Sequence, residues 1–280
     1  MRIRVGTAIH TTLTVIRTVI HIAIRTVIHI AIPMVHTATS TTMAEVPVPN
    51  PDSTAAPEFT TDLSLTRLLQ LCSVSLPVGG YAFSQGMEYA IDAGWIRNAA
   101  GVRSWVDEQL TLSLAQTDVP ILRMAMAAAE QQDWHELAAL NELVLACRET
   151  HELRLTDTAM GEALHRLLIS LKFDVPFERG EDISFICLFA LAAGQWGISY
   201  RAAALGFLWS WLENQIAAAT KLVPLGQTQA QQLLVELQPE LPAALELADK
   251  VNKDSVGAGL PALAIASSRH EHMYSRLFRS

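Results

Sequence analysis

Residues 199–222 read SYRAAALGFLWSWLENQIAAATKL, and the spacing of their apolar side chains decides the fold. Apolar residues recur every three or four positions, which is the spacing of one face of an α-helix. They form a single stripe: Leu205, Leu208, Leu212, Ile216 and Ala219. Ser199 stands where an N-cap belongs, so we expect one long helix that ends near Leu222 and buries this stripe. Ser210, Asn214 and Lys221 lie near one another on a different face of the same helix.

The rest of the chain from residue 61 onward repeats this helical spacing. Cap residues, Gly pairs and Pro separate the segments, and no stretch alternates convincingly as a strand. We expect helices over 62–72, 83–93, 98–114, from 118 onward, 134–148, 156–171, 182–195, 228–237 and 240–252. The strongly apolar 182–195 segment is predicted to be central. The pattern predicts an all-α fold: a single helical-bundle domain of about ten helices over residues 61–280, with a flexible C-terminal tail from about residue 254.

Composition narrows the class of partner. The chain has 280 residues, of which 50% are hydrophobic and 17% charged, with a formal net charge of −8. Residues 1–44 contain four Arg and no acidic residue, so residues 45–280 hold 16 basic and 28 acidic residues, a net charge of −12. This charge argues against nucleic acid and favours basic proteins or cations as partners. The apolar surplus, with Trp196, Trp209 and Trp211 close together, indicates that part of the surface faces another chain.

The three cysteines, Cys72, Cys147 and Cys187, are odd in number and far apart. They form no Cys-x-x-Cys pair, so a disulfide framework or a zinc knuckle is not predicted. We expect buried thiols in a reducing compartment, which places the protein in the cytoplasm.

Residues 1–60 differ from the rest and are predicted to be a low-complexity, non-globular extension. The octapeptide RTVIHIAI occurs twice in tandem, at 17–24 and 25–32, and its period fits strand alternation rather than a helix. Arg and His interrupt it too often for a membrane helix, and it is a poor secretory signal. Its composition resembles an organellar transit peptide. We prefer a true start near Met43, followed by a Pro-rich disordered lead over 44–60.

Motifs of common enzymes are missing from the sequence. It has no G-x-x-x-x-G-K-[ST], G-x-G-x-x-G, H-E-x-x-H or G-x-S-x-G, so we expect that the chain does not bind and hydrolyse a nucleotide on its own, and we expect no cofactor. Four carboxylates near one helix start, Glu149, Glu152, Asp157 and Glu162, leave a helical enzyme as the alternative, although acids there also complement the helix dipole. His270 and His272 are weak metal-ligand candidates, but adjacent positions diverge on a helix, so a closed site is not predicted.

Four segments resemble the urease accessory protein family UreF. They are SLPVGGYAFSQGMEYAIDAGWI (75–96), RETHELRLTDTAMGEAL (148–164), LWSWLENQIAAATKLVPLGQ (208–227) and SSRHEHMYSRLFRS (267–280). They occur in the family's order and spacing and cover about residues 63–280. One departure is Ala230–Gln231, where the family pattern has Gly before Gln.

The resemblance implies an all-helical homodimer without enzymatic activity that acts in nickel insertion into urease. It implies binding to a second accessory protein, UreD (also called UreH), and recruitment of the GTPase UreG. The assembly then docks on apo-urease, where GTP hydrolysis accompanies nickel delivery. The protein is expected to be the adaptor of this assembly and to modulate the GTPase.

The chain end carries most of the predicted partner-binding residues. Tyr274, Leu277 and Phe278 are expected to anchor the UreD/UreH-type partner, with Arg276 and Arg279 as charge-assisted donors. Because a Gly/Pro-interrupted segment precedes them, we expect this end to be mobile when free and to order in the complex. The alternative is a frayed terminus without a role.

Two further groups of residues are candidates for partner contact. Glu213, Asn214 and Lys221 would meet the GTPase, although Lys221 equally complements a helix C-terminus. Four residues follow the Gly turn: Tyr81, Ser84, Gln85 and Glu88. Ser84 and Glu88 share a helix face, which indicates either a partner contact or local helix support.

Overall fold

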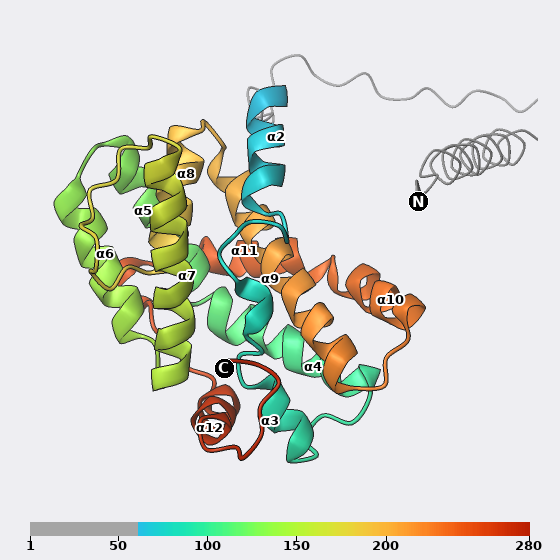
Figure 1. Cartoon of the computed structure of the whole chain (residues 1–280). Coiled ribbons are helices and arrows are strands. Elements are labelled where there is room, and N and C mark those ends of the chain that lie inside the picture. Colours follow the sequence, from blue (N-terminus) through green and yellow to red (C-terminus); the bar gives the residue numbers. More distant parts are fainter. Residues whose placement is uncertain (1–60) are drawn as a thin grey trace, which may run out of the picture. The chain divides into compact units, whose positions relative to one another are not determined.

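The computed structural model describes residues 61–280. The expectations for the tandem octapeptide, the start near Met43 and the Pro-rich lead lie outside the described residues. Residues 61–280 form helices and no strand, which confirms the all-α prediction (Figure 1). The helices are α2 (Asp62–Leu71), α3 (Met87–Asp92), α4 (Ala99–Gln109), α5 (Asp118–Glu130), α6 (Trp134–Ala146), α7 (His151–Ser170), α8 (Phe185–Gln195), α9 (Tyr200–Leu222), α10 (Gln227–Leu237), α11 (Glu240–Ala248) and α12 (Pro261–His270).

Short turns of other helical types join some of these helices. Gly80–Ala82 (η1) and Lys253–Ser255 (η3) are 3₁₀ turns, and Leu110–Leu114 (η2) is a π-helical turn that continues α4. None of the described helices has the length and apolarity that crossing a bilayer requires.

The centre of the core is α8. Every residue from Ile186 to Ala193 is buried, which is typical of a helix surrounded by other helices. It packs mainly against α5 and α7, as Figure 1 shows. The central position expected for 182–195 is thus confirmed, although the helix itself begins at Phe185.

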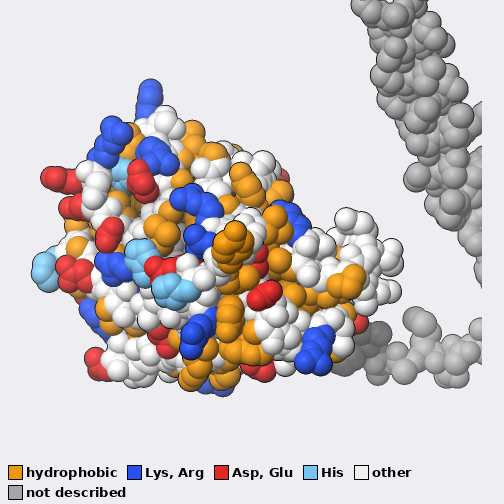
Figure 2. Space-filling view, turned by 60° about the horizontal axis from the view of Figure 1, so that its bottom comes forward, with side chains coloured by type: hydrophobic (Ala, Val, Ile, Leu, Met, Phe, Trp, Pro, Cys, Tyr) orange, Lys and Arg blue, Asp and Glu red, His pale blue; other side chains and the backbone are white. Residues whose placement is uncertain are grey.

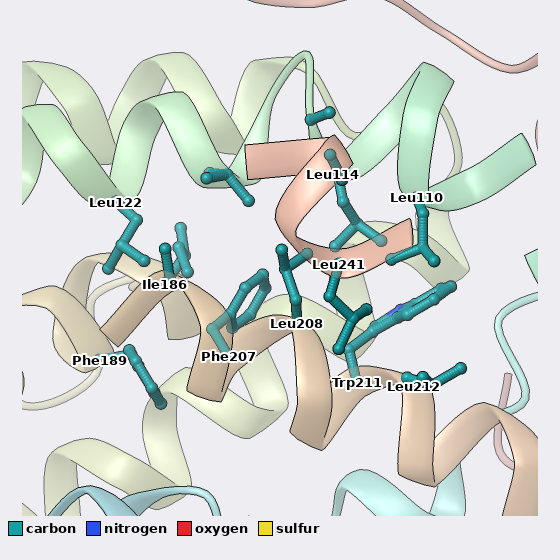
Figure 3. Packing of buried hydrophobic residues seen from close by; sticks show 14 of the residues in the cluster. Leu110, Leu114, Leu122, Ile186, Phe189, Phe207, Leu208, Trp211, Leu212 and Leu241 are labelled. Atoms are coloured by element: carbon teal, nitrogen blue, oxygen red, sulfur yellow. The ribbon is translucent and has the colours of Figure 1, made fainter. Parts of the chain in front are cut away.

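The long helix α9 connects this core to the other half of the domain. It contacts α2, α3, α4, α5, α8, α10 and α11. Of its predicted stripe, Leu208, Leu212, Ile216 and Ala219 are buried, and Leu205 is partly buried. Figure 3 shows Phe207, Leu208 and Trp211 of α9 facing Leu110, Leu114 and Leu241. One stripe of apolar residues therefore packs against several helices at once.

The cysteines behave as small apolar residues. All three are free thiols, with Cys72 and Cys187 buried and Cys147 half-buried. Burial raises the pKa of the Cys72 thiol to about 12, so reactive thiolate is scarce there.

The helix expected over 83–93 is shorter in the structure. Residues 83–86 are extended or left-handed, with φ of 50° at Gln85 and 79° at Gly86, and α3 begins only at Met87. Conversely, α7 begins at His151 rather than near 156, because the Thr150 side chain accepts a hydrogen bond from Leu153 N and caps it.

The segment expected to be flexible from about residue 254 contains a helix and buried residues in the structure. Pro261–His270 forms α12, which packs on α3 and α7. Beyond it, Phe278 is 5% exposed and Ser280 is 1% exposed. This end of the chain is packed because distant side chains supply its hydrogen bonds.

Candidate partner-binding site

Residues 274–280 run back over the loop between η1 and α3. Arg279 N donates to the Ala82 carbonyl oxygen at 2.8 Å. The Ser280 carbonyl oxygen accepts from Ser84 N at 2.5 Å, from Gln85 N at 3.2 Å and from Ser84 Oγ at 2.9 Å. The left-handed backbone at Gln85 and Gly86 turns these amides toward the chain end, which explains why no helix forms there.

The Glu88 carboxylate holds the next residues of the chain end. It is 7% exposed and accepts from Leu277 N at 2.6 Å and from Phe278 N at 2.9 Å. Its Oε2 also lies 2.9 Å from His270 Nε2. Hydrogen bonds to an ionised carboxylate are stronger than neutral ones, so Glu88 is a fixed anchor for the chain end.

His270 joins Glu88 to a second buried carboxylate. Its side chain is 0% exposed, and Nδ1 lies 2.8 Å from Glu152 Oε2. Glu152 Oε1 in turn accepts from Arg276 Nη1 at 2.8 Å. We call Glu88, Glu152, His270 and Arg276 the chain-end network.

The chain-end network leaves no room for a metal at His270. Both ring nitrogens of His270 are hydrogen-bonded to carboxylates, and His272 is exposed. Among residues 61–280 no group of three or more His, Cys, Asp or Glu side chains is arranged to hold a metal ion. The weak hypothesis that His270 and His272 bind a metal together therefore does not fit the described residues.

Apolar and basic side chains remain exposed around the network. Tyr274 is fully exposed, and Leu277 and Tyr81 are 63% and 64% exposed. Lys221 Nζ lies 5.4 Å from the centre of the Phe278 ring, and the Arg279 guanidinium lies 5.6 Å from the Phe83 ring. We define the chain-end surface by its six members: Tyr81, Lys221, Tyr274, Arg276, Leu277 and Arg279.

Figure 2 views the molecule with the side of α3, α12 and the chain end brought forward. Hydrophobic side chains gather there with Lys and Arg between them. The structure thus brings together residues from three separate segments of the sequence: Tyr81, Lys221 and residues 274–279. Such a mixture of apolar anchors and a polar rim is typical of protein interfaces.

Other predicted contact residues lie beneath this surface. Ser84 is 0% exposed and Glu88 and Phe278 are nearly buried, so they hold the chain end and do not face a partner. Gln85 Oε1 accepts from Trp211 Nε1 at 2.7 Å and from Gln215 Nε2 at 3.2 Å, which ties the loop to α9. The sequence left Ser84 and Glu88 as either a partner contact or local helix support, and in the structure both are buried and Ser84 Oγ accepts from Glu88 N at 3.4 Å.

Glu213 and Asn214 are half-buried rather than freely exposed. Burial raises the pKa of the Glu213 carboxyl. Asn214 Nδ2 donates to the Ser210 carbonyl oxygen at 3.0 Å and lies close under Gly80, where an added Cβ would come within 3.2 Å of it. Asn214 therefore supports the turn that presents Tyr81.

The carboxylates proposed for a helical enzyme mostly have structural partners. Asp157 accepts from Arg148 Nε at 2.8 Å, from Ser184 Oγ at 2.8 Å and from Phe185 N at 2.8 Å, so it caps α8. Arg148 also pairs with Asp118 at 2.6 Å. Burial lowers the pKa of Arg148, but the charges of Asp118 and Asp157 more than offset this and raise it.

The remaining acids of that group do not converge on a reaction centre. Glu152 belongs to the chain-end network, and Glu162 forms an exposed pair with Arg166 one turn along the helix. Glu149 is exposed and lies against Gly259, where a Cβ would come within 2.0 Å of its Oε1. The described geometry thus supplies no free pair of carboxylates for acid–base work.

A cavity of about 130 Å³ lies between the loop before α3 and helices α7, α8 and α9. Its lining is mixed and includes Asp118, Arg148 and Asp157 as well as aromatic side chains of α8 and α9. Gln215 Oε1 is buried there without a hydrogen-bond partner. A polar cavity of this size has room for ordered water, which would satisfy that oxygen.

The described residues form an all-helical fold with a packed chain end and an exposed mixture of apolar and basic side chains, which is the kind of surface found at protein interfaces. The comparisons with known proteins show the family. The sequence model of the UreF family matches residues 96–238.

Three similar proteins bear the name urease accessory protein UreF. The one from Marinomonas sp. (strain MWYL1) is 63% identical over 221 residues, which is 79% of this chain and 96% of that protein. The one from Pseudomonas entomophila (strain L48) is 46% identical over 222 residues, covering 79% and 99% of the two chains. The one from Teredinibacter turnerae is 46% identical over 219 residues, covering 77% and 98%. The chain therefore belongs to the UreF family of urease accessory proteins.

The family assignment decides between the two hypotheses left by the sequence. The relatives are named as accessory proteins, and the chain is likewise an accessory protein rather than an enzyme. The alternative of a helical enzyme using the carboxylates around Glu149–Asp157 is wrong.

Proposed function

We propose that the chain is the adaptor of urease maturation. It links a UreD/UreH-type protein and a UreG-type GTPase to apo-urease during nickel insertion, works as a homodimer in the cytoplasm and modulates GTP hydrolysis. The observation that carries the proposal is the chain-end surface. Tyr274 and Leu277 are exposed there, on a segment whose backbone amides at Leu277 and Phe278 donate to the buried Glu88 carboxylate.

The energetics of this arrangement favour binding. Burying a side chain such as Tyr274 or Leu277 is worth about 1.5–3 kcal/mol. Ordering a free segment would take back about 1–2 kcal/mol per residue of backbone entropy. Because the chain end is already packed in this structure, that cost falls on folding rather than on binding, and a preorganised surface retains more of the gain.

The charges of the surface specify the chemistry of the partner. Arg276, Arg279 and Lys221 surround the exposed apolar groups, although residues 45–280 as a whole are strongly acidic. The matching surface is therefore an apolar pocket edged by carboxylates, which Arg recognises in a bidentate manner. We assign this surface to the UreD/UreH-type protein and the neighbouring Lys221 side to the GTPase.

Exposed leucines on α2 support the homodimer. Leu65 and Leu69 are 48% and 63% exposed and lie one turn apart on one face of this short helix, so a second chain packed on that face would remove them from water. The molecular mass of the purified chain in solution measures this part of the proposal.

The test of the adaptor proposal uses the double variant Tyr274→Ala/Leu277→Ala. Both side chains are exposed, so the variant should keep its helical content and melting temperature. Its affinity for a tagged UreD/UreH-type partner should fall about tenfold or more, because truncated anchor residues usually dominate binding.

The matched control is Val235→Ala, which shortens an apolar residue that is 64% exposed on α10. It should bind the partner as the unaltered chain does. Equal affinity for the double variant and the Val235→Ala control would contradict the proposal.

A further inference from the structure

His270 connects the packed body of the protein to the chain-end surface. It is the last residue of α12, its ring is completely buried, and both ring nitrogens face carboxylate oxygens. On one side Glu88 holds the backbone amides of Leu277 and Phe278. On the other side Glu152 holds the Arg276 guanidinium. Every contact of the chain-end network therefore passes through the two carboxylates that His270 joins.

The hydrogen-bond inventory of imidazole makes this position sensitive to one proton. A neutral imidazole has one N–H donor and one acceptor nitrogen, whereas an imidazolium has two donors. Ionised carboxylates only accept, and the two ring nitrogens lie 2.8 Å and 2.9 Å from such oxygens. Between two ionised carboxylates only the imidazolium satisfies both contacts, because a neutral ring would set a lone pair against an anionic oxygen in a buried place.

The charges around the ring lead to the same requirement. The charged groups that face it are Glu88 from α3, Glu152 from α7 and Arg276 from the chain end. With a protonated His270 the four groups sum to zero, and without the proton a net negative charge is left. A nearby hydrogen bond joins the hydroxyl groups of Thr150, the N-cap of α7, and Ser267 of α12 at 2.8 Å, and because both groups are uncharged it cannot compensate.

We infer that His270 is the positioning residue of the chain-end surface and acts as an imidazolium, which makes the seating of residues 271–280 dependent on protonation. Loss of the proton removes one donor and sets the charges of Glu88 and Glu152 against each other. The amides of Leu277 and Phe278 then lose a fixed acceptor, and the segment that presents Tyr274 and Leu277 loosens, while Arg279 and Ser280 keep their hydrogen bonds to Ala82 and Ser84. The functional consequence rests on the adaptor proposal: capture of the UreD/UreH-type partner should weaken as the pH rises.

Hydrogen exchange on the full chain tests the inference directly. Exchange of the Leu277 and Phe278 amides is followed by NMR from about pH 5 to about pH 9, a range that includes the interval of about pH 5 to pH 8 in which histidine usually changes charge, and is corrected for the intrinsic rate at each pH. Protection should fall about tenfold or more across the range, the effect of weakening hydrogen bonds to a charged acceptor. In parallel, the ring nitrogen shifts should show both His270 nitrogens protonated at the low end.

Two variants separate positioning from general destabilisation. His270→Gln removes the titrating group, so protection of the two amides should be low and independent of pH. His272→Gln, a change of the same type at an exposed position two residues further on, should behave as the unaltered chain does. A neutral His270 ring throughout the range, or protection that does not change with pH in the unaltered chain, overturns the inference even if His270→Gln fails to fold.

The inference and the adaptor proposal can fail separately. If exchange depends on pH and Tyr274→Ala/Leu277→Ala still captures the partner normally, the positioning role of His270 is retained and the binding role of the chain-end surface is rejected. Loss of capture in that double variant with exchange independent of pH would do the reverse.

Discussion

Replacing Arg148 with Met should strongly destabilise the protein, since this side chain neutralises two buried carboxylates. The Arg148 side chain is 15% exposed, and its partners Asp118 and Asp157 are 8% and 7% exposed. Met fills similar space but carries no charge. Removing one partner of a buried ion pair typically costs about 3–5 kcal/mol, because the remaining charge loses its counter-ion.

The local contacts indicate the lower part of that range. Asp157 would keep its hydrogen bonds from Ser184 Oγ and Phe185 N. Asp118 stands in the first turn of α5, where the helix dipole favours a negative charge. We therefore expect a loss of about 3 kcal/mol, which is a large part of the roughly 5–15 kcal/mol that stabilises an ordinary domain.

Urea unfolding followed by circular dichroism measures this loss, with Arg166→Met as the control. Arg166 also pairs with a carboxylate, Glu162, but the two side chains are 54% and 61% exposed. Such an exposed pair is worth about 0.5 kcal/mol or less. Arg148→Lys should fall between the two, because it keeps the charge and loses the fork that reaches both acids. A loss for Arg148→Met no larger than for the Arg166 control would refute the reasoning.

Two further outcomes are expected. Gly161→Ala in α7 should lower the free energy of unfolding by at least about 1–3 kcal/mol, because its Cβ would stand 1.9 Å from the Ile183 carbonyl oxygen. The control Gly194→Ala in α8 meets nothing within 4 Å and should be neutral or stabilising by up to about 1 kcal/mol. Equal unfolding free energies for the two variants would contradict this close approach. Lys221→Ala should lower urease activation with an almost unchanged melting temperature, since its cation–π contact is worth only about 0.5–1 kcal/mol. The control Lys250→Ala, at another exposed position, should leave urease activation intact. A large loss of stability with normal urease activation would instead support a purely structural role for Lys221.

The helices themselves were predictable from the sequence, because their signals are local. The stripe of α9 repeats at helical spacing, and a side chain's face on a helix depends only on its position along that helix. The unbroken apolar run of α8 likewise indicated a surrounded helix, and Ile186–Ala193 are indeed buried. Boundaries were less reliable where a tertiary contact decided them, as at Gln85 and Gly86.

The sequence indicated which residues belong to the candidate site but not what each of them does in the structure. The sequence pointed to Lys221 and to the segment from Tyr274 onward, and both contribute to one surface. It left Glu88 as either a partner contact or local helix support, whereas the carboxylate is buried and holds the backbone of Phe278. No pattern in the sequence shows that His270 hydrogen-bonds to two carboxylates, because its partners Glu152 and Glu88 are 118 and 182 residues away along the chain.

By itself, therefore, the sequence determined the all-helical class, the central segment and the family. These depend on the order of apolar and polar residues along short stretches. Only the tertiary structure decided which charges are buried and which face water, and whether the end of the chain is free or packed. The physical reason is that a carboxylate or an imidazole is fixed by the groups that surround it, and folding brings those groups from distant parts of the chain.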